Sequence, residues 1–209
     1  MHLENYITLF ASFTAVFVSY YILKQDPKSK INRIYALASI ISSLVWTSTI
    51  AFFRESTTIE SALMWNKGIY IVSVIIGLIY FWFTLNFPKP HKPKLISEVL
   101  IISFAIFFFY TILFTDLFIS KVELNDIGNK ATLGPIYILW LVWMIYIYFY
   151  GGFMIVRDVN KLGAIEKTQL RFFTIGVVFP AFAIIPTNAI LPLFGVYEHI
   201  WVGPLFTII

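Results

Sequence analysis

Six long runs of apolar residues constrain the fold of this chain more than any other feature. They cover residues 6–23, 34–53, 68–85, 95–114, 135–156 and 172–193, and Glu98 is the only charged residue within them. The hydrocarbon core of a bilayer is about 30 Å thick, and about 20 apolar residues in a helix cross it. Charged residues make up 12% of the 209 positions, whereas a soluble domain is about a quarter charged. Each run therefore predicts a membrane-spanning helix, in which every backbone polar group finds a partner within the chain.

A seventh apolar run, residues 200–209, ends after ten residues. Such a half-length span would leave unsatisfied backbone groups at the bilayer midplane, so we expect the natural chain to continue beyond Ile209. The expected fold class is all-α: a polytopic membrane helix bundle of the seven-transmembrane (7TM) type, with six full spans and a truncated seventh. Residues 1–209 are expected to form one membrane-embedded sensor domain.

The orientation of the bundle follows from the Lys and Arg residues, because those in short loops stay on the cytoplasmic side. Eleven of the 15 basic residues follow the first, third and fifth runs: Lys24, Lys28, Lys30, Arg33, Lys89, Lys92, Lys94, Arg157, Lys161, Lys167 and Arg171. The alternate loops hold most of the acids. We expect an N-terminus outside and a C-terminus in the cytoplasm, in the inner (plasma) membrane. The net charge of +4 is thus a topology signal, and no nucleic-acid partner is expected.

The longest predicted outer segment is residues 115–134. Its residues 118–124 alternate apolar with polar side chains before the turn-prone Asn125-Asp126-Ile127-Gly128-Asn129. This pattern is typical of a β-hairpin, and an irregular solvated loop is the alternative. Both are left open.

The sequence offers no catalytic or metal-binding constellation. The three histidines, His2, His91 and His199, are scattered over termini and loops, and the chain has no cysteine. No paired carboxylates lie inside a run, although general acid–base chemistry needs such groups. We therefore predict no enzymatic activity in this chain, no metal site and no cofactor.

Uncharged polar and aromatic residues are the candidates for a ligand site. Asn188 and Thr187 lie near the outer end of the sixth run, and Trp46, Trp140 and Trp143 are predicted at a similar depth. Aromatic walls with one or two polar groups are typical of small-molecule sites. The alternatives are that Asn188 bonds two helices together, worth about 0.6–2 kcal/mol, and that the tryptophans pack the core.

Three prolines punctuate the sixth run. Pro180, Pro186 and Pro192 are spaced six residues apart, and each removes a backbone hydrogen bond. A helix weakened in this way can adopt two packings that a ligand biases. We therefore predict a hinge at these prolines, although prolines are also frequent in membrane helices.

Several local patterns together resemble the N-terminal 7TM region of bacterial sensor histidine kinases. The patterns are Met64-Trp65-Asn66-Lys67 with Phe83-Thr84-Leu85-Asn86-Phe87-Pro88, then Thr115-Asp116-Leu117-Phe118 with Gly134-Pro135-Ile136-Tyr137, then Glu166-Lys167-Thr168-Gln169-Leu170-Arg171 with Thr187-Asn188-Ala189-Ile190-Leu191-Pro192, and Gly203-Pro204-Leu205-Phe206. Their order and spacing carry the resemblance. It implies an outward N-terminus, seven helices and a cytoplasmic output module, often with a phosphoacceptor and an ATP-binding kinase core. Kinase activity is not carried over to this chain, which ends inside the seventh run.

The function expected from these observations is that of a transmembrane sensory input module of a histidine-kinase-type receptor. It would sense a small or membrane-soluble ligand, or the state of the membrane, and pass the signal through helix rearrangement to a cytoplasmic output domain. The expected partners are the lipid bilayer, an unknown small molecule and that output domain, with a homodimer left open. The alternative is a small seven-span transporter or permease-like protein, against which the absence of charged residues from the span interiors argues; Glu98 lies one turn from the start of its span.

Overall fold

The computed structural model describes residues 2–125, 128–157, 159–178 and 184–205. Within these ranges five helical segments are long and apolar enough to cross a membrane. They are α1 (Leu3–Gln25), the continuous segment Lys30–Glu55, α4 (Ile59–Thr84), α5 (Leu95–Phe114) and α6 (Ile136–Arg157). The predicted spans 172–193 and 200–209 both contain residues outside the described ranges.

The segment Lys30–Glu55 is one helical rod with a change of winding in its middle. It comprises α2 (Lys30–Ser39), the π-helical turn η1 (Ile40–Val45) and α3 (Trp46–Glu55). Ser29 caps the start of α2 by accepting a hydrogen bond from the backbone of Asn32. Thr58 caps α4 in the same way, through the backbone of Ser61. Such caps satisfy backbone donors that a helix start leaves free, so short connections suffice between neighbouring helices.

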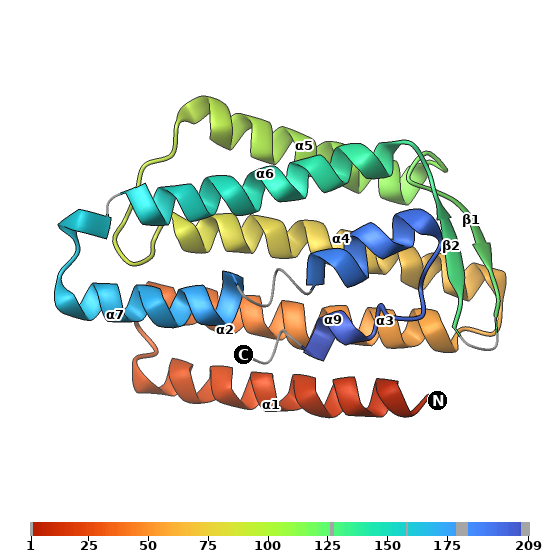
Figure 1. The fold of residues 1–209 in the computed structure, drawn as a ribbon, viewed down its shortest axis with the longest axis horizontal. Coiled ribbons are helices and arrows are strands. Elements are labelled where there is room, and N and C mark those ends of the chain that lie inside the picture. The colour runs from red at the N-terminus through yellow and green to blue at the C-terminus, as the bar shows by residue number, and fades with distance from the viewer. Residues whose placement is uncertain (1, 126–127, 158, 179–183, 206–209) are drawn as a thin grey trace.

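The long helices lie side by side and alternate in direction (Figure 1). The connections from α1 to α2, from α4 to α5 and from α6 to α7 lie together at one end, which we call the basic end because eleven of the 15 basic residues lie in or beside them. Helix α4 is central, since it packs against α2, α3, α5 and α6. Large apolar side chains such as Phe10, Phe17 and Phe149 point outward and are more than two-thirds exposed, and a bilayer would cover them.

A two-stranded antiparallel hairpin covers the opposite end of the bundle, the hairpin end (Figure 1). Strand β1 (Ile119–Glu123) pairs with β2 (Lys130–Leu133), with Val122 opposite Ala131. The segment 115–134, for which the sequence left a hairpin and an irregular loop open, thus contains a hairpin in its described residues. Phe118, Ile119 and Val122 are buried, and they do not alternate strictly with exposed residues because the strand is irregular between Ile119 and Lys121.

Beyond α6 the chain is irregular. The short turn η2 (Val159–Lys161) leads to α7 (Ala164–Phe173), which continues into the π-helical turn η3 (Thr174–Val178). Glu166 anchors the start of α7: its carboxylate accepts a hydrogen bond from the Gly163 backbone and lies 3.1 Å from Lys89 Nζ. The Gly163 bond and then Lys89 hold the pKa of Glu166 below its usual range.

After residue 183 the backbone departs from α-helical winding at the prolines. Pro186 begins the π-helical turn η4 (Pro186–Ile190), and Pro192 lies in the 3₁₀ turn η5 (Leu191–Phe194). A proline cannot donate the backbone bond of a regular helix, which accounts for both turns. Gly195, with φ of 73°, ends the segment, and α9 (Val202–Leu205) packs back against η4. Pro180 lies outside the described residues, and the hinge stays a prediction.

Candidate ligand cavity

An elongated cavity of about 730 Å³ lies inside the bundle. Its walls come from the Lys30–Glu55 segment, α4, α6, the α7–η3 segment and η4. Lining residues run along Lys30–Glu55 from Asn32 at the basic end to Trp46 in the hairpin half. At 1.5 Å per helical residue this distance is about 20 Å. The volume lies within the range of about 300–1,000 Å³ that is usual for small-molecule sites.

The walls of the cavity are mainly aromatic and aliphatic, with scattered uncharged polar groups. Among the described residues that line it, none is a Lys, Arg, Asp or Glu. The hydroxyls of Ser39 and Ser73 donate to carbonyls of the helices, those of Ala15 and Tyr70. Their hydrogens are therefore already used, and only their acceptor capacity is open to a bound molecule.

Two buried tryptophans line the hairpin half of the cavity. Trp46 is 7% exposed and Trp140 is 4% exposed, and each contributes to the wall. Neither indole Nε1 has a hydrogen-bond partner among the described residues. An indole nitrogen can only donate, so each of these two lining side chains carries a buried donor that lacks an acceptor among the described residues.

Asn188 also reaches the cavity wall, but its amide is engaged by the protein. Its Nδ2 donates to the backbone carbonyl of Ile200 at 2.7 Å, and its Oδ1 accepts from Thr187 Oγ1 at 2.8 Å. Gly203 of α9 lies so close that a Cβ there would be 1.9 Å from Asn188 Oδ1. The side chain therefore connects η4 to the segment that enters α9, which is the bonding role that the sequence left open beside ligand contact.

The structure brings together three of the five candidate site residues: Trp46, Trp140 and Asn188. Trp143 does not line the cavity; its ring packs on Phe108 of α5 at 5.2 Å between centroids. Thr187 is also outside the lining, and its hydroxyl bonds to Ile184 and Asn188. Neither Pro186 nor Pro192 lines the cavity, although Ile184, two residues before Pro186, and Ala189, three residues before Pro192, do.

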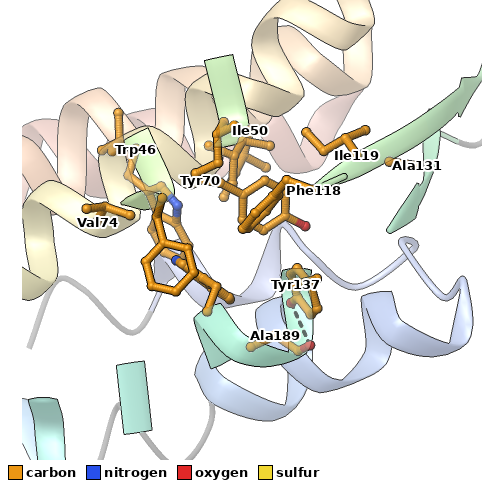
Figure 2. Close-up of a cluster of buried hydrophobic side chains, with 14 of the residues drawn as sticks. Trp46, Ile50, Tyr70, Val74, Phe118, Ile119, Ala131, Tyr137 and Ala189 are labelled. Atoms are coloured by element: carbon orange, nitrogen blue, oxygen red, sulfur yellow. Dashed lines mark hydrogen bonds between the residues drawn. The ribbon is translucent and has the colours of Figure 1, made fainter. Parts of the chain in front are cut away.

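Sequence reasoning missed an aromatic cluster next to the cavity. Tyr70 of α4 packs edge-on against Tyr137 and Trp140 of α6. The centroid of its ring lies 5.0 Å from that of Phe118, beneath the hairpin. Figure 2 shows Tyr70, Phe118 and Tyr137 gathered from three segments of the chain. The Tyr137 hydroxyl donates to the Ala189 carbonyl at 2.7 Å (Figure 2). This bond connects η4 to α6 near the two tryptophans. In the sequence, Tyr137 was named only as part of the resemblance motif Gly134-Pro135-Ile136-Tyr137.

Asn66 is a second residue that the sequence named only within the motif Met64-Trp65-Asn66-Lys67. It is 1% exposed, and neither its Nδ2 nor its Oδ1 has a partner among the described residues. It lies one turn before Tyr70 on α4 and precedes the apolar run that begins at residue 68. A buried amide without a partner is costly, and Asn66 is not among the described residues that line the cavity.

The alternating apolar helices, the lipid-facing aromatic surface and the internal cavity define a multi-pass helical membrane protein. The chain matches the family model for the N-terminal 7TM region of histidine kinase over residues 7–200, and it belongs to this family. The resemblance seen in the sequence is thereby confirmed, and the family implies a membrane sensory module. Comparisons with curated proteins and with solved structures gave no match.

No kinase domain is evident in the chain, since the match covers the 7TM region. In the part of the chain that the structure describes, no group of three or more His, Cys, Asp or Glu residues could hold a metal ion. The cavity is therefore the feature on which a sensory role is best argued.

Proposed function

We propose that this chain is the transmembrane input module of a histidine-kinase-type receptor and senses a small or membrane-soluble molecule that enters the cavity. The signal passes through a rearrangement of helices to a cytoplasmic output domain. One observation carries the proposal: the cavity has walls both on the regular helices and on the irregular segment from α7 to η4. A bound molecule therefore touches a fixed part of the bundle and a segment suited to move.

The irregular segment supplies the element that a ligand can bias. Its turns η3 and η4 are not α-helical, and hydrogen bonds tie η4 to neighbouring segments. The described ties include those from Tyr137 to Ala189 and from Asn188 to Ile200. A ligand that contacts Ile184 and Asn188 better in one packing than in another shifts the population toward that packing.

The orientation belongs to the same proposal. The basic end is cytoplasmic and the hairpin end is outside, because Lys and Arg in short loops are retained on the cytoplasmic side. In this orientation the N-terminus is outside and the irregular segment starts on the cytoplasmic side at α7. The protein is then a multi-pass protein of the plasma membrane.

The test is a dose response of the intact receptor, measured as autophosphorylation. Trp140→Phe keeps an aromatic side chain and removes one unpaired donor, and it is expected to shift the half-maximal signal concentration about fivefold, the value of one neutral hydrogen bond. Trp82→Phe is the matched control, because Trp82 is 44% exposed and does not line the cavity. An unchanged response for Trp140→Phe and for Asn188→Ala, at equal membrane levels, would contradict the proposal.

A further inference from the structure

The chemistry of the cavity wall narrows the class of molecule that it can hold. This inference rests on the proposed function, because it concerns the ligand of the same cavity. The shape is the first constraint: the cavity extends about 20 Å along the helices within a volume of about 730 Å³. A long, thin molecule fills such a space better than a compact one.

The second constraint is charge. The described lining residues include no charged side chain, and a charged group held away from water without a partner is strongly disfavoured. A bound molecule is therefore neutral within the cavity.

The third constraint is the pair of unpaired indole donors, Trp46 Nε1 and Trp140 Nε1. Their side chains line the hairpin half of the cavity, and an indole nitrogen can only donate. A molecule that satisfies them needs an oxygen acceptor at one of its ends, such as a hydroxyl, a carbonyl or an ester.

The opposite half of the cavity offers mainly apolar contact to a chain. Phe83, Phe87 and Phe173 form one aromatic cluster there, with centroids 5.0–5.2 Å apart, and all three line the cavity. Asn32 also lines this end, and its Nδ2 donates to the backbone carbonyls of Ile22 and Asp26. An apolar tail fits this half, with its polar head at the tryptophans.

The route of entry is the fourth constraint. Ile145 of α6, Phe172 of α7 and Ile175 of η3 line the cavity and are also 39%, 72% and 61% exposed. The cavity therefore opens sideways between α6 and the α7–η3 segment, on a surface that the bilayer would cover. A molecule dissolved in the membrane reaches it without passing through water.

We infer that the cavity binds a neutral, single-chain amphiphile from the bilayer. Its oxygen head accepts hydrogen bonds from Trp46 and Trp140, and its hydrocarbon chain extends toward Phe83, Phe87 and Phe173. The whole molecule enters from the bilayer through the lateral opening beside Phe172.

The test uses the purified 209-residue chain in lipid nanodiscs and a long-chain alcohol that carries a photoreactive diazirine near the end of its chain. Mass spectrometry is expected to find the label on Phe83, Phe87 or Phe173, and a tenfold excess of octadecanol is expected to remove it. Label on outward residues such as Phe10 and Phe149 should persist under the same competition. Label confined to outward residues, or competition by stearate equal to that by octadecanol, would overturn the inference.

Two sets of variants sharpen the test. Ala38→Phe fills the cavity and is expected to abolish the competed label, whereas Leu37→Phe on the same helix, 43% exposed, leaves it unchanged. The double variant Trp46→Phe/Trp140→Phe keeps an aromatic ring at both positions and is expected to weaken octadecanol about 25-fold through the loss of two neutral hydrogen bonds. Unchanged competition in the double variant overturns the assignment of the head, even if Ala38→Phe fails to fold.

The inference about the ligand and the proposed function can be refuted independently of each other. If octadecanol binds as described while the receptor response to Trp140→Phe is unchanged, the inference stands and the proposed function fails. If Trp140→Phe alters signalling and no competed label is found in the cavity, the proposed function stands and the amphiphile is wrong.

Discussion

Individual buried polar residues hold the hairpin end of the bundle together. The side chain of Arg54 at the end of α3 is 4% exposed, although the sequence placed it in an outer loop. Its Nη1 donates to Asn5 Oδ1 at 2.6 Å, and its Nη2 lies 3.8 Å from Glu4 Oε2. A buried charge is retained only where it is paired and hydrogen-bonded, and here the partners belong to α1. Arg54 therefore ties α1 to α3.

Replacing Arg54 tests this tie. Arg54→Met is expected to lower the free energy of unfolding by about 2 kcal/mol, because a hydrogen bond to a charged group contributes about 1.5–3 kcal/mol. Thermal unfolding in nanodiscs measures the change. Lys121→Met is the control, since Lys121 and Glu123 form an exposed pair worth at most about 1 kcal/mol. Equal melting temperatures for the two variants would refute the role of Arg54.

At the scale of the elements, close packing of α4 against α6 depends on a glycine. A Cβ at Gly151 would lie 2.7 Å from the Tyr80 ring and 3.0 Å from Thr84, whereas a Cβ at Gly152 would meet nothing within 4 Å. The two neighbours on α6 therefore face different surroundings. Tyr80 also lines the cavity, so the spacing of these helices and the shape of the cavity are connected.

The pair of glycines provides a matched comparison. Gly151→Ala is expected to destabilise the bundle by about 1–3 kcal/mol, the usual effect of overpacking. Gly152→Ala is expected to be neutral or to stabilise by up to about 1 kcal/mol, because alanine is the better helix former. Chemical unfolding of both variants in the same detergent measures the difference between their free energies of unfolding. If Gly151→Ala were as stable as Gly152→Ala or more stable, the close packing at Gly151 would be contradicted.

A second contact between elements is that of α9 with η4. Asn188 and Gly203 meet there, and a Cβ on residue 203 would displace the amide from the Ile200 carbonyl. Asn188→Ala and Gly203→Ala are each expected to lower the melting temperature. The double variant should be little worse than either single one, because both remove the same contact. Additive losses in this cycle would show that the two residues act independently.

At the scale of the whole molecule, charge and structure divide the bundle into two unlike ends. The basic end carries most of the Lys and Arg residues, and the hairpin end is covered by β1 and β2 (Figure 1). The cavity extends from the hairpin half toward the basic end. A molecule that filled this cavity would contact several helices of the bundle along about 20 Å.

The orientation can be tested directly because the chain has no cysteine. Lys121→Cys on the hairpin and Lys92→Cys at the basic end both occupy exposed positions. A maleimide that does not cross membranes is expected to label residue 121 in intact cells and residue 92 only after permeabilisation, since basic loops remain in the cytoplasm. The reverse pattern would mean that the N-terminus is cytoplasmic.

The predicted apolar runs could be read from the chain because length and composition are local properties. The runs 6–23, 34–53, 68–85, 95–114 and 135–156 all fall mainly within long helices. The hairpin could be read only as one of two alternatives, since its pairing joins residues seven to fourteen positions apart. The depth of Trp46, Trp140 and Asn188 followed from the constant rise of a helix, and the three residues do share one cavity.

The direction in which each side chain faces depends on the packing of the helices and is not visible in the chain. Trp143 follows Trp140 by three residues, which lie about 60° apart around a helix; this suffices to turn Trp143 toward α5 and Trp140 toward the cavity. Arg54 and Asn66 lie at the ends of apolar runs, where water would be expected, and are buried. Local sequence thus determined which five runs form long helices, whereas contacts between distant segments determined what each residue faces.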